Sequence, residues 1–160
     1  MCLSAGVSFT ASVLLTGGGV AIVAKAMQRN LRYLPLGLMP LFAGIQQFME
    51  GNVWVGVNTG NHLMLVWGAM GFIFFTWFMW PFWIPFAVWA LEKPTSPRRP
   101  WFLAMAFLGL VLGVLLYVPH GLGTDWLVVT VNHHSLAYEN SMLLDQFLPR
   151  WLTYTLYVFL

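Results

Sequence analysis

The sequence predicts an all-α integral membrane protein, a bundle of four or five transmembrane helices with a short β-hairpin or loop cap on its outer face. Three observations carry this prediction: a charge-poor composition, apolar runs of membrane-spanning length and a one-sided distribution of basic residues. The 160 residues are 59% hydrophobic and 8% charged, with a mean hydropathy of +0.75, whereas soluble domains average about 25% charged. So few charges cannot cover a soluble surface, and the seven basic residues do not form the patch that a nucleic-acid partner requires.

Residues 1–160 are expected to form one transmembrane domain, because apolar runs of about 20 residues recur along the whole chain. The predicted helices and the outer segment are, in chain order, about 5–25, 34–56, 63–91, 101–119, 120–148 (outer) and 149–160. The first run has no basic segment before it and no cleavage site after it, which favours a retained helix over a signal peptide. The last run would reach only about 18 Å against a hydrocarbon core of about 30 Å, so we expect the natural chain to continue past Leu160.

The third run is the longest and holds two prolines, Pro81 and Pro85. Each removes a helical hydrogen bond, so kinking or tilt is expected. The same run carries Trp77, Trp80 and Trp83. These rings could line a cavity or contact a pigment or lipid, but lipid-facing bulk is the simpler interpretation.

Basic residues set the expected orientation. Six of the seven lie in the first and third loops: Lys25, Arg29, Arg32, Lys93, Arg98 and Arg99. Two spans separate these loops, so both fall on one side, which the positive-inside rule identifies as cytoplasmic. The protein is therefore predicted to be multi-pass, with its N-terminus and residues 57–62 and 120–148 outside. All four histidines and four of the five acids then lie near or beyond the outer leaflet.

The outer segment differs in character from the rest of the chain. Trp126-Leu-Val-Val-Thr-Val is rich in β-branched residues and is followed by Asn132, a pattern typical of a strand. We expect it to pair with residues 135–139 in a hairpin that caps the outer face.

Glu50 stands in an otherwise apolar run. An ionised side chain at the centre of a membrane helix costs roughly 2.5 to 3.5 kcal/mol, so a helix that keeps one normally uses it. Gln46, Gln47 and Trp54 share its helical face. This polar face could bind an ion or ligand or relay protons. Alternatively, the glutamines and a protonated glutamate join helices together, and both interpretations stay open.

Small hydroxyl residues recur every four positions in the first run, at Ser4, Ser8, Ser12 and Thr16. Such a stripe lets helix backbones approach closely, and packing is its expected role. We predict that it faces Glu50, with Ser4 or Ser8 near the carboxylate.

A metal site is the second candidate on the outer side. His120, His133 and His134 could combine with Asp125 and His62, because imidazole with carboxylate suits zinc, copper or iron. However, adjacent histidines on a strand point to opposite faces, and no established metal-binding spacing is present. Interfacial polar residues without a metal are the more economical interpretation.

Several segments resemble a family of uncharacterised bacterial polytopic membrane proteins, a domain of unknown function, whose members begin Met-Cys-x-Ser-Ala-x-x-Ser-Phe. The matching segments are Met1-Cys2-Leu-Ser-Ala-Gly-Val-Ser-Phe, Gln46-Gln47-Phe-Met-Glu50-Gly51-Asn-Val-Trp54, Trp80-Pro81…Pro85…Glu92 and the arginine pair 98–99. The resemblance covers most of 1–100 and is weaker at the hairpin, with His134 and Tyr138. It implies a location in the bacterial inner (cytoplasmic) membrane and further helices after this point, but no catalytic residues.

Three functions are compatible with these features. The first is a non-enzymatic membrane accessory or binding subunit, which packs against other membrane protein subunits or binds lipid or another hydrophobic cofactor. The second is an intramembrane metal-dependent enzyme acting on lipid, with Glu50 as general base and outer histidines as ligands. The third is an ion- or proton-coupled transporter or sensor working through Glu50. The first needs no motif, and none is found.

Overall fold

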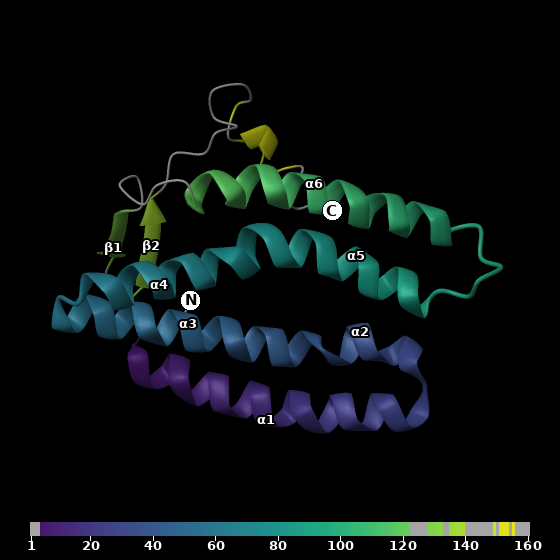
Figure 1. Ribbon diagram of the computed structural model, residues 1–160, viewed down its shortest axis with the longest axis horizontal. Helices are drawn as coiled ribbons and strands as arrows, with labels where there is room; N and C mark the ends of the chain where they lie inside the picture. The colour runs from purple at the N-terminus through teal and green to yellow at the C-terminus, as the bar shows by residue number, and fades with distance from the viewer. Residues whose placement is uncertain are drawn as a thin grey trace.

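Long helices lie side by side in chain order, with a two-stranded sheet against one end (Figure 1). The computed structural model describes residues 4–121, 128–132, 135–139, 149, 151–153 and 155. The elements are α1 (Ala5–Arg29), η1 (Leu31–Tyr33), α2 (Leu34–Gly37), α3 (Met39–Thr59), α4 (His62–Ile73), η2 (Phe74–Met79), α5 (Trp80–Leu91), α6 (Arg99–Gly121), β1 (Val128–Asn132) and β2 (Ser135–Glu139). Helix α3 packs between α1 and α4, and α6 packs on α5.

Three helical stretches in the described part are long and apolar enough to cross a membrane: Ala5–Arg29, His62–Leu91 and Arg99–His120. The expected span over 34–56 is not among them. The structure divides that run into α2 and α3, with a proline in the first turn of each helix, and the short helix η1 precedes it. A proline removes a backbone donor and favours a helix start over continuation. The glutamines and Glu50 also lower the hydropathy of α3. Of the expected last run, the described residues include a helical turn at Trp151–Thr153.

The chain reverses sharply between α3 and α4. Gly60 has a φ of 68°, a left-handed conformation that glycine adopts without a steric penalty and that commonly ends a helix. The side chain of Asn61 then accepts a hydrogen bond from the Met64 N–H at 3.1 Å and caps α4. This turn places α4 antiparallel to α3.

A six-residue π-helix, η2, interrupts the stretch from His62 to Leu91 just before Pro81. A proline ring in a regular α-helix would clash with the carbonyl four residues earlier. Wider turns relieve this conflict, and the Trp80 N–H donates to the carbonyl of Phe75, five residues back. The distortion expected from the prolines therefore takes the form of a π segment, a feature often found at functional sites.

The sequence favoured lipid-facing bulk for Trp77, Trp80 and Trp83, but all three also contact other parts of the protein. Trp80 Nε1 donates to Gln46 Oε1 at 2.8 Å, and Trp83 Nε1 donates to the Pro35 carbonyl at 2.9 Å. Trp77 packs against the buried leucines of α6. The indole N–H groups of Trp80 and Trp83 therefore have partners inside the protein, and all three rings are half-buried.

Glycines let neighbouring helices approach closely. A Cβ on Gly44 would lie 2.8 Å from the Thr16 nitrogen of α1, and one on Gly109 would overlap the Pro81 carbonyl of α5. Both distances are shorter than real side chains allow. Contacts of this kind are typical of helix pairs in membranes, so the helix spacing depends on these positions remaining glycine.

The predicted hairpin is confirmed. β1 and β2 are antiparallel, with Val129 opposite Tyr138 and Val131 opposite Leu136. Leu136 is fully buried and joins a cluster with three residues of the helices, which we call the hairpin cluster: Val53, Trp54, Ala69 and Leu136. The sheet therefore packs against the end of the bundle where α3 meets α4.

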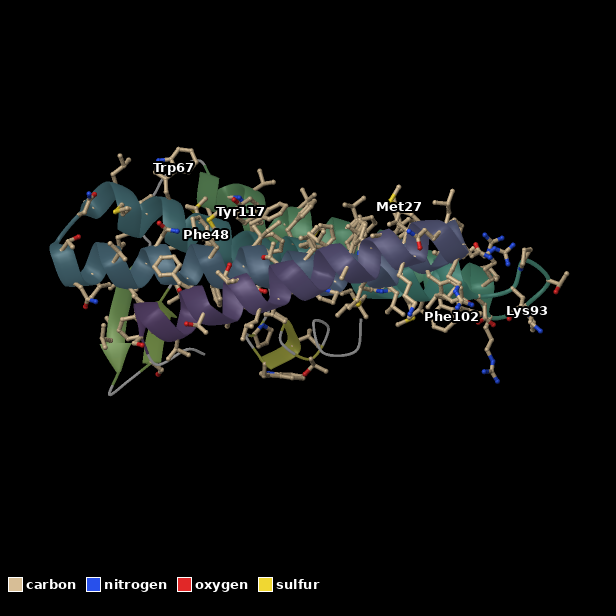
Figure 2. The ribbon with its side chains drawn as sticks, turned by 90° about the horizontal axis from the view of Figure 1, so that it is seen from below. Met27, Phe48, Trp67, Lys93, Phe102 and Tyr117 are labelled. Atoms are coloured by element: carbon tan, nitrogen blue, oxygen red, sulfur yellow. The ribbon has the colours of Figure 1, made fainter. Side chains whose placement is uncertain are left out.

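The two basic loops lie together at the other end of the bundle, as the sequence predicts. The α1–α2 and α5–α6 connections are neighbours in Figure 1, and Figure 2 shows Lys93 far from Trp67, which lies toward the hairpin end. In the α5–α6 connection, the Ser96 hydroxyl bonds to the Glu92 carboxylate, and the Arg99 guanidinium lies 4.6 Å from the centre of the Trp89 ring.

Substitution of the contact glycines tests this packing. Gly44→Ala and Gly109→Ala should each destabilise the protein by about 1–3 kcal/mol, because the added methyl forces backbones apart. Gly17→Ala is the matched control, since a Cβ there meets nothing within 4 Å, and it should be neutral or stabilising by up to about 1 kcal/mol. Thermal unfolding in detergent measures all three. Equal effects at the contact and control positions would contradict the close-packing interpretation.

Candidate functional site

Glu50 is fully buried in α3, at 0% exposure. Its neighbour Gly51 lies so close to α1 that a Cβ there would be 2.6 Å from Cε1 of Phe9. Helices α1 and α4 flank α3 on either side. Glu50 therefore lies inside the protein, between helices and away from bulk solvent.

Tyr138 of β2 packs against the hairpin cluster, close to Glu50 of α3. Burial raises the pKa of the Tyr138 hydroxyl well above its ordinary value, and the nearby negative charge of Glu50 raises this pKa further. The Tyr138 ring stacks on Phe72 of α4, with ring centroids 5.0 Å apart and planes 12° from parallel. Its hydroxyl has no hydrogen-bond partner among the described residues. The Tyr138 phenol and the buried side chain of Glu50 thus lie in one region beneath the sheet.

Ser8 occupies the same level of the bundle as Glu50. Gly44 contacts α1 at Thr16, and Ala5 packs on the hairpin cluster, so the part of α3 between these contacts faces the part of α1 that holds Ser8. Ser8 is 0% exposed, and its hydroxyl has no hydrogen-bond partner within the described part. The Ser8 hydroxyl therefore lies inside the bundle, on the side of α1 that faces α3, and can still form a hydrogen bond.

Ser4 has a different role from the one expected. It is exposed, and its hydroxyl accepts a hydrogen bond from the Val7 N–H at 3.4 Å, as the N-cap of α1. Trp54 is buried in the hairpin cluster. Ser4 therefore caps the start of α1, and Trp54 is part of the helix surface on which the sheet packs.

Gln46 links α3 to the π segment. Its Nε2 donates to Thr76 Oγ1 at 3.1 Å, while its Oε1 accepts from Trp80 Nε1 at 2.8 Å. The Thr76 hydroxyl in turn donates to the Phe72 carbonyl at 3.2 Å. Both ends of the Gln46 amide are thus engaged between helices, which is the joining role that the sequence left open. Gln47 is half-buried on the same helix.

Sequence reasoning missed Thr76 and the inward role of Tyr138. Phe72, Thr76 and Trp80 recur every four residues, which marks one helical face. Leu136 and Tyr138 alternate along a strand, which places them on one face of the sheet. Both signals were present, but neither shows which distant residue the face will meet.

The histidines do not assemble into a metal site within the described part of the chain. His120 is 1% exposed near the end of α6, whereas His62 is exposed at the start of α4. No group of three or more potential ligands occurs among the residues that the structure describes. The other predicted ligands, Asp125, His133 and His134, lie outside the described residues.

These features define a class: a helical bundle with three apolar helices of membrane-spanning length in its described part, a buried carboxylate and a two-stranded sheet at one end. The chain belongs to a family of unknown function, DUF6629, whose model matches residues 1–148. The resemblance to an uncharacterised family is thereby confirmed. No curated protein and no solved structure matches the chain.

Alkaline titration tests the placement of Tyr138. The neutral phenol contributes stability that is fully present below the unfolded pKa of about 10 and is lost as the pH rises toward the higher folded value. Tyr138 should therefore stay neutral in the folded protein near pH ~10.

We expect Tyr138→Phe to leave the tyrosinate absorbance of the folded protein near pH ~10 unchanged. In denaturant the same change should lower the absorbance by one fifth, because the chain has five tyrosines. A loss of tyrosinate absorbance from the folded protein at that pH would show that Tyr138 is accessible to base.

Proposed function

We propose that this protein is a non-enzymatic, integral accessory or binding subunit of the bacterial cytoplasmic membrane. The observation that carries the proposal is the apolar surface of its two outer helices. Val13 and Leu14 of α1 are 71% and 70% exposed, and Trp101 and Phe107 of α6 are 72% and 66% exposed. Soluble monomers rarely expose apolar surfaces of this kind, whereas lipid and partner helices cover them.

The orientation proposed is N-terminus outside and basic end inside. It is supported by the two basic loops lying together at one end of the bundle (Figure 1), which agrees with the positive-inside rule. The hairpin and Glu50 then lie toward the outer leaflet.

Membrane integration and orientation can be measured together. The protein should stay with membranes washed in alkaline carbonate and be released only by detergent. In a Cys2→Ala background, Asn58→Cys should react with an impermeant maleimide in intact spheroplasts, while Thr95→Cys should react only after lysis. Both positions are exposed and lie at opposite ends of the bundle. Release by carbonate would contradict integration, and the reverse labelling pattern would contradict the orientation.

A subunit role predicts a stable partner. Solubilisation of native membranes in mild detergent should yield a complex in which a second membrane protein is present in fixed ratio and remains through gel filtration. A monodisperse monomer with catalytic activity would count against the proposal.

A second function is favoured by the burial of Glu50 beside Tyr138, beneath the hairpin. We propose that these residues couple a proton or cation to the position of the sheet, as a sensor or transporter would require. A change of charge at Glu50 would act directly on the residue that attaches β2 to the helices. The enzyme hypothesis has no comparable support from the described residues.

Glu50→Gln tests this second function, because it removes the ionisable group and keeps the size of the side chain. Any pH-dependent transport or conformational response of the reconstituted protein should be lost in this variant. Glu92→Gln is the matched control, since Glu92 lies at the basic end and bonds to Ser96, and it should keep the response. An unchanged response in Glu50→Gln would exclude the coupling role.

A further inference from the structure

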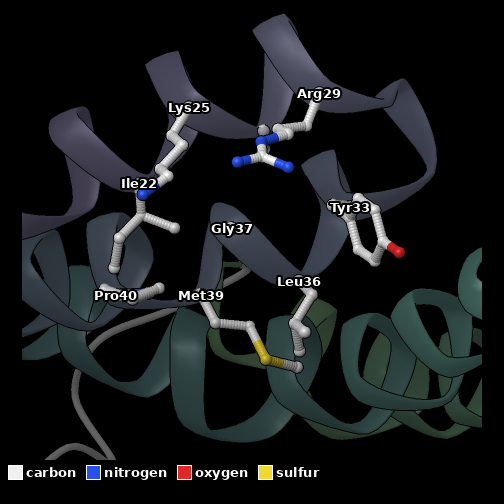
Figure 3. A pocket seen from close by; sticks show the side chains of 9 residues that line it. Ile22, Lys25, Arg29, Tyr33, Leu36, Gly37, Met39 and Pro40 are labelled. Carbon is white, nitrogen blue, oxygen red and sulfur yellow. The ribbon is translucent and has the colours of Figure 1, made fainter.

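A groove lies at the basic end of the bundle, between the last turns of α1 and the segment that returns through η1 and α2 to α3. Its volume is about 700 Å³, within the range of small-ligand sites. Figure 3 shows Lys25 and Arg29 on the α1 side and Leu36, Met39 and Pro40 across from them. One wall is thus cationic at its rim, and the other is apolar.

The two cations are arranged to act together. Lys25 and Arg29 are four residues apart on α1, so they lie on the same helical face, and the Arg29 guanidinium points toward the groove in Figure 3. Both are exposed. Among the residues that the structure describes, no acidic residue lines the groove, and its two basic lining residues are Lys25 and Arg29.

The deeper lining is apolar. Ile22 and Ala26 of α1 meet Gly37 of α2 at the groove, where a Cβ on Gly37 would lie 3.4 Å from Ile22 Cγ2. Leu36 is 45% exposed, and Tyr33 stands at the edge of the groove. A ligand that fits has an anionic group beside an aliphatic portion, which describes an anionic phospholipid and does not describe a free phosphate.

We propose that this groove is a binding site for an anionic phospholipid, with its phosphate held by Lys25 and Arg29 and the start of an acyl chain along Leu36 and Met39. The proposal rests on the membrane location proposed above, because the basic end then lies at the level of the cytoplasmic headgroups. Basic pockets between membrane helices favour anionic lipids for the same electrostatic reason. The site deepens the binding role by naming the lipid class and its contacts.

The test compares two double variants of equal charge change in detergent-purified protein. Lys25→Gln/Arg29→Gln removes both groove cations. Lys93→Gln/Arg98→Gln removes two exposed cations of the α5–α6 connection, at the same end but outside the groove lining. Binding of phosphatidylglycerol is measured by native mass spectrometry and by the shift in thermal unfolding temperature. Phosphatidylcholine and inorganic phosphate serve as the neutral-lipid and free-anion probes.

The native protein should bind phosphatidylglycerol and gain thermal stability, with little response to phosphatidylcholine or phosphate. The groove variant should bind phosphatidylglycerol at least about tenfold more weakly, and the control variant should bind as the native protein does. Equal losses in both variants, or no loss in the groove variant, would overturn the site. An equal response to free phosphate would overturn the lipid assignment. Carbonate release would instead reject the membrane location, so the two failures are distinguishable.

Discussion

The structure depends on neighbouring helices that cover the polar side chains of α3. This helix carries Glu50 and two glutamines, and it is the long helix that lacks the apolarity to cross a membrane alone. The more apolar helices α1 and α4 pack against it on either side, and glycine contacts such as Gly44 on Thr16 bring the backbones close. The Gln46 amide also forms hydrogen bonds to Thr76 of η2 and Trp80 of α5. A hydrogen-bonded amide is far less costly inside an apolar bundle than an unpaired one, so the neighbours of α3 make its burial possible.

Burial against the helices also stabilises the hairpin. β1 and β2 together form a two-stranded sheet, which is at best marginally stable alone in water. Leu136 and Tyr138 attach it to the helices through the hairpin cluster and the ring of Phe72. The same tyrosine lies close enough to Glu50 for the carboxylate to affect its pKa. The residues that attach the sheet and the buried Glu50 therefore lie in the same part of the bundle.

The two ends of the bundle differ in chemistry. One end has the sheet, the buried carboxylate and the turn at Gly60, whereas the other collects six of the seven basic residues. Between them, the outer faces of α1 and α6 are apolar. This distribution agrees with the proposed orientation in a bilayer whose cytoplasmic leaflet is anionic, and the proposed lipid site is the groove beside Lys25 and Arg29.

The sequence by itself determined the helical class, the pairing of the hairpin, the clustering of the basic loops and the presence of a polar face around Glu50. These properties depend on composition and on periodicity within one segment, which are readable without knowing the neighbours. Only the tertiary structure decided that Tyr138 approaches Glu50, that Trp80 and Thr76 bind Gln46, that the tryptophans of the third run contact other parts of the protein and that the second predicted span is divided at its prolines. Each depends on which faces of distant segments meet. That outcome is set by the packing of whole helices against one another, a property that local pattern does not contain.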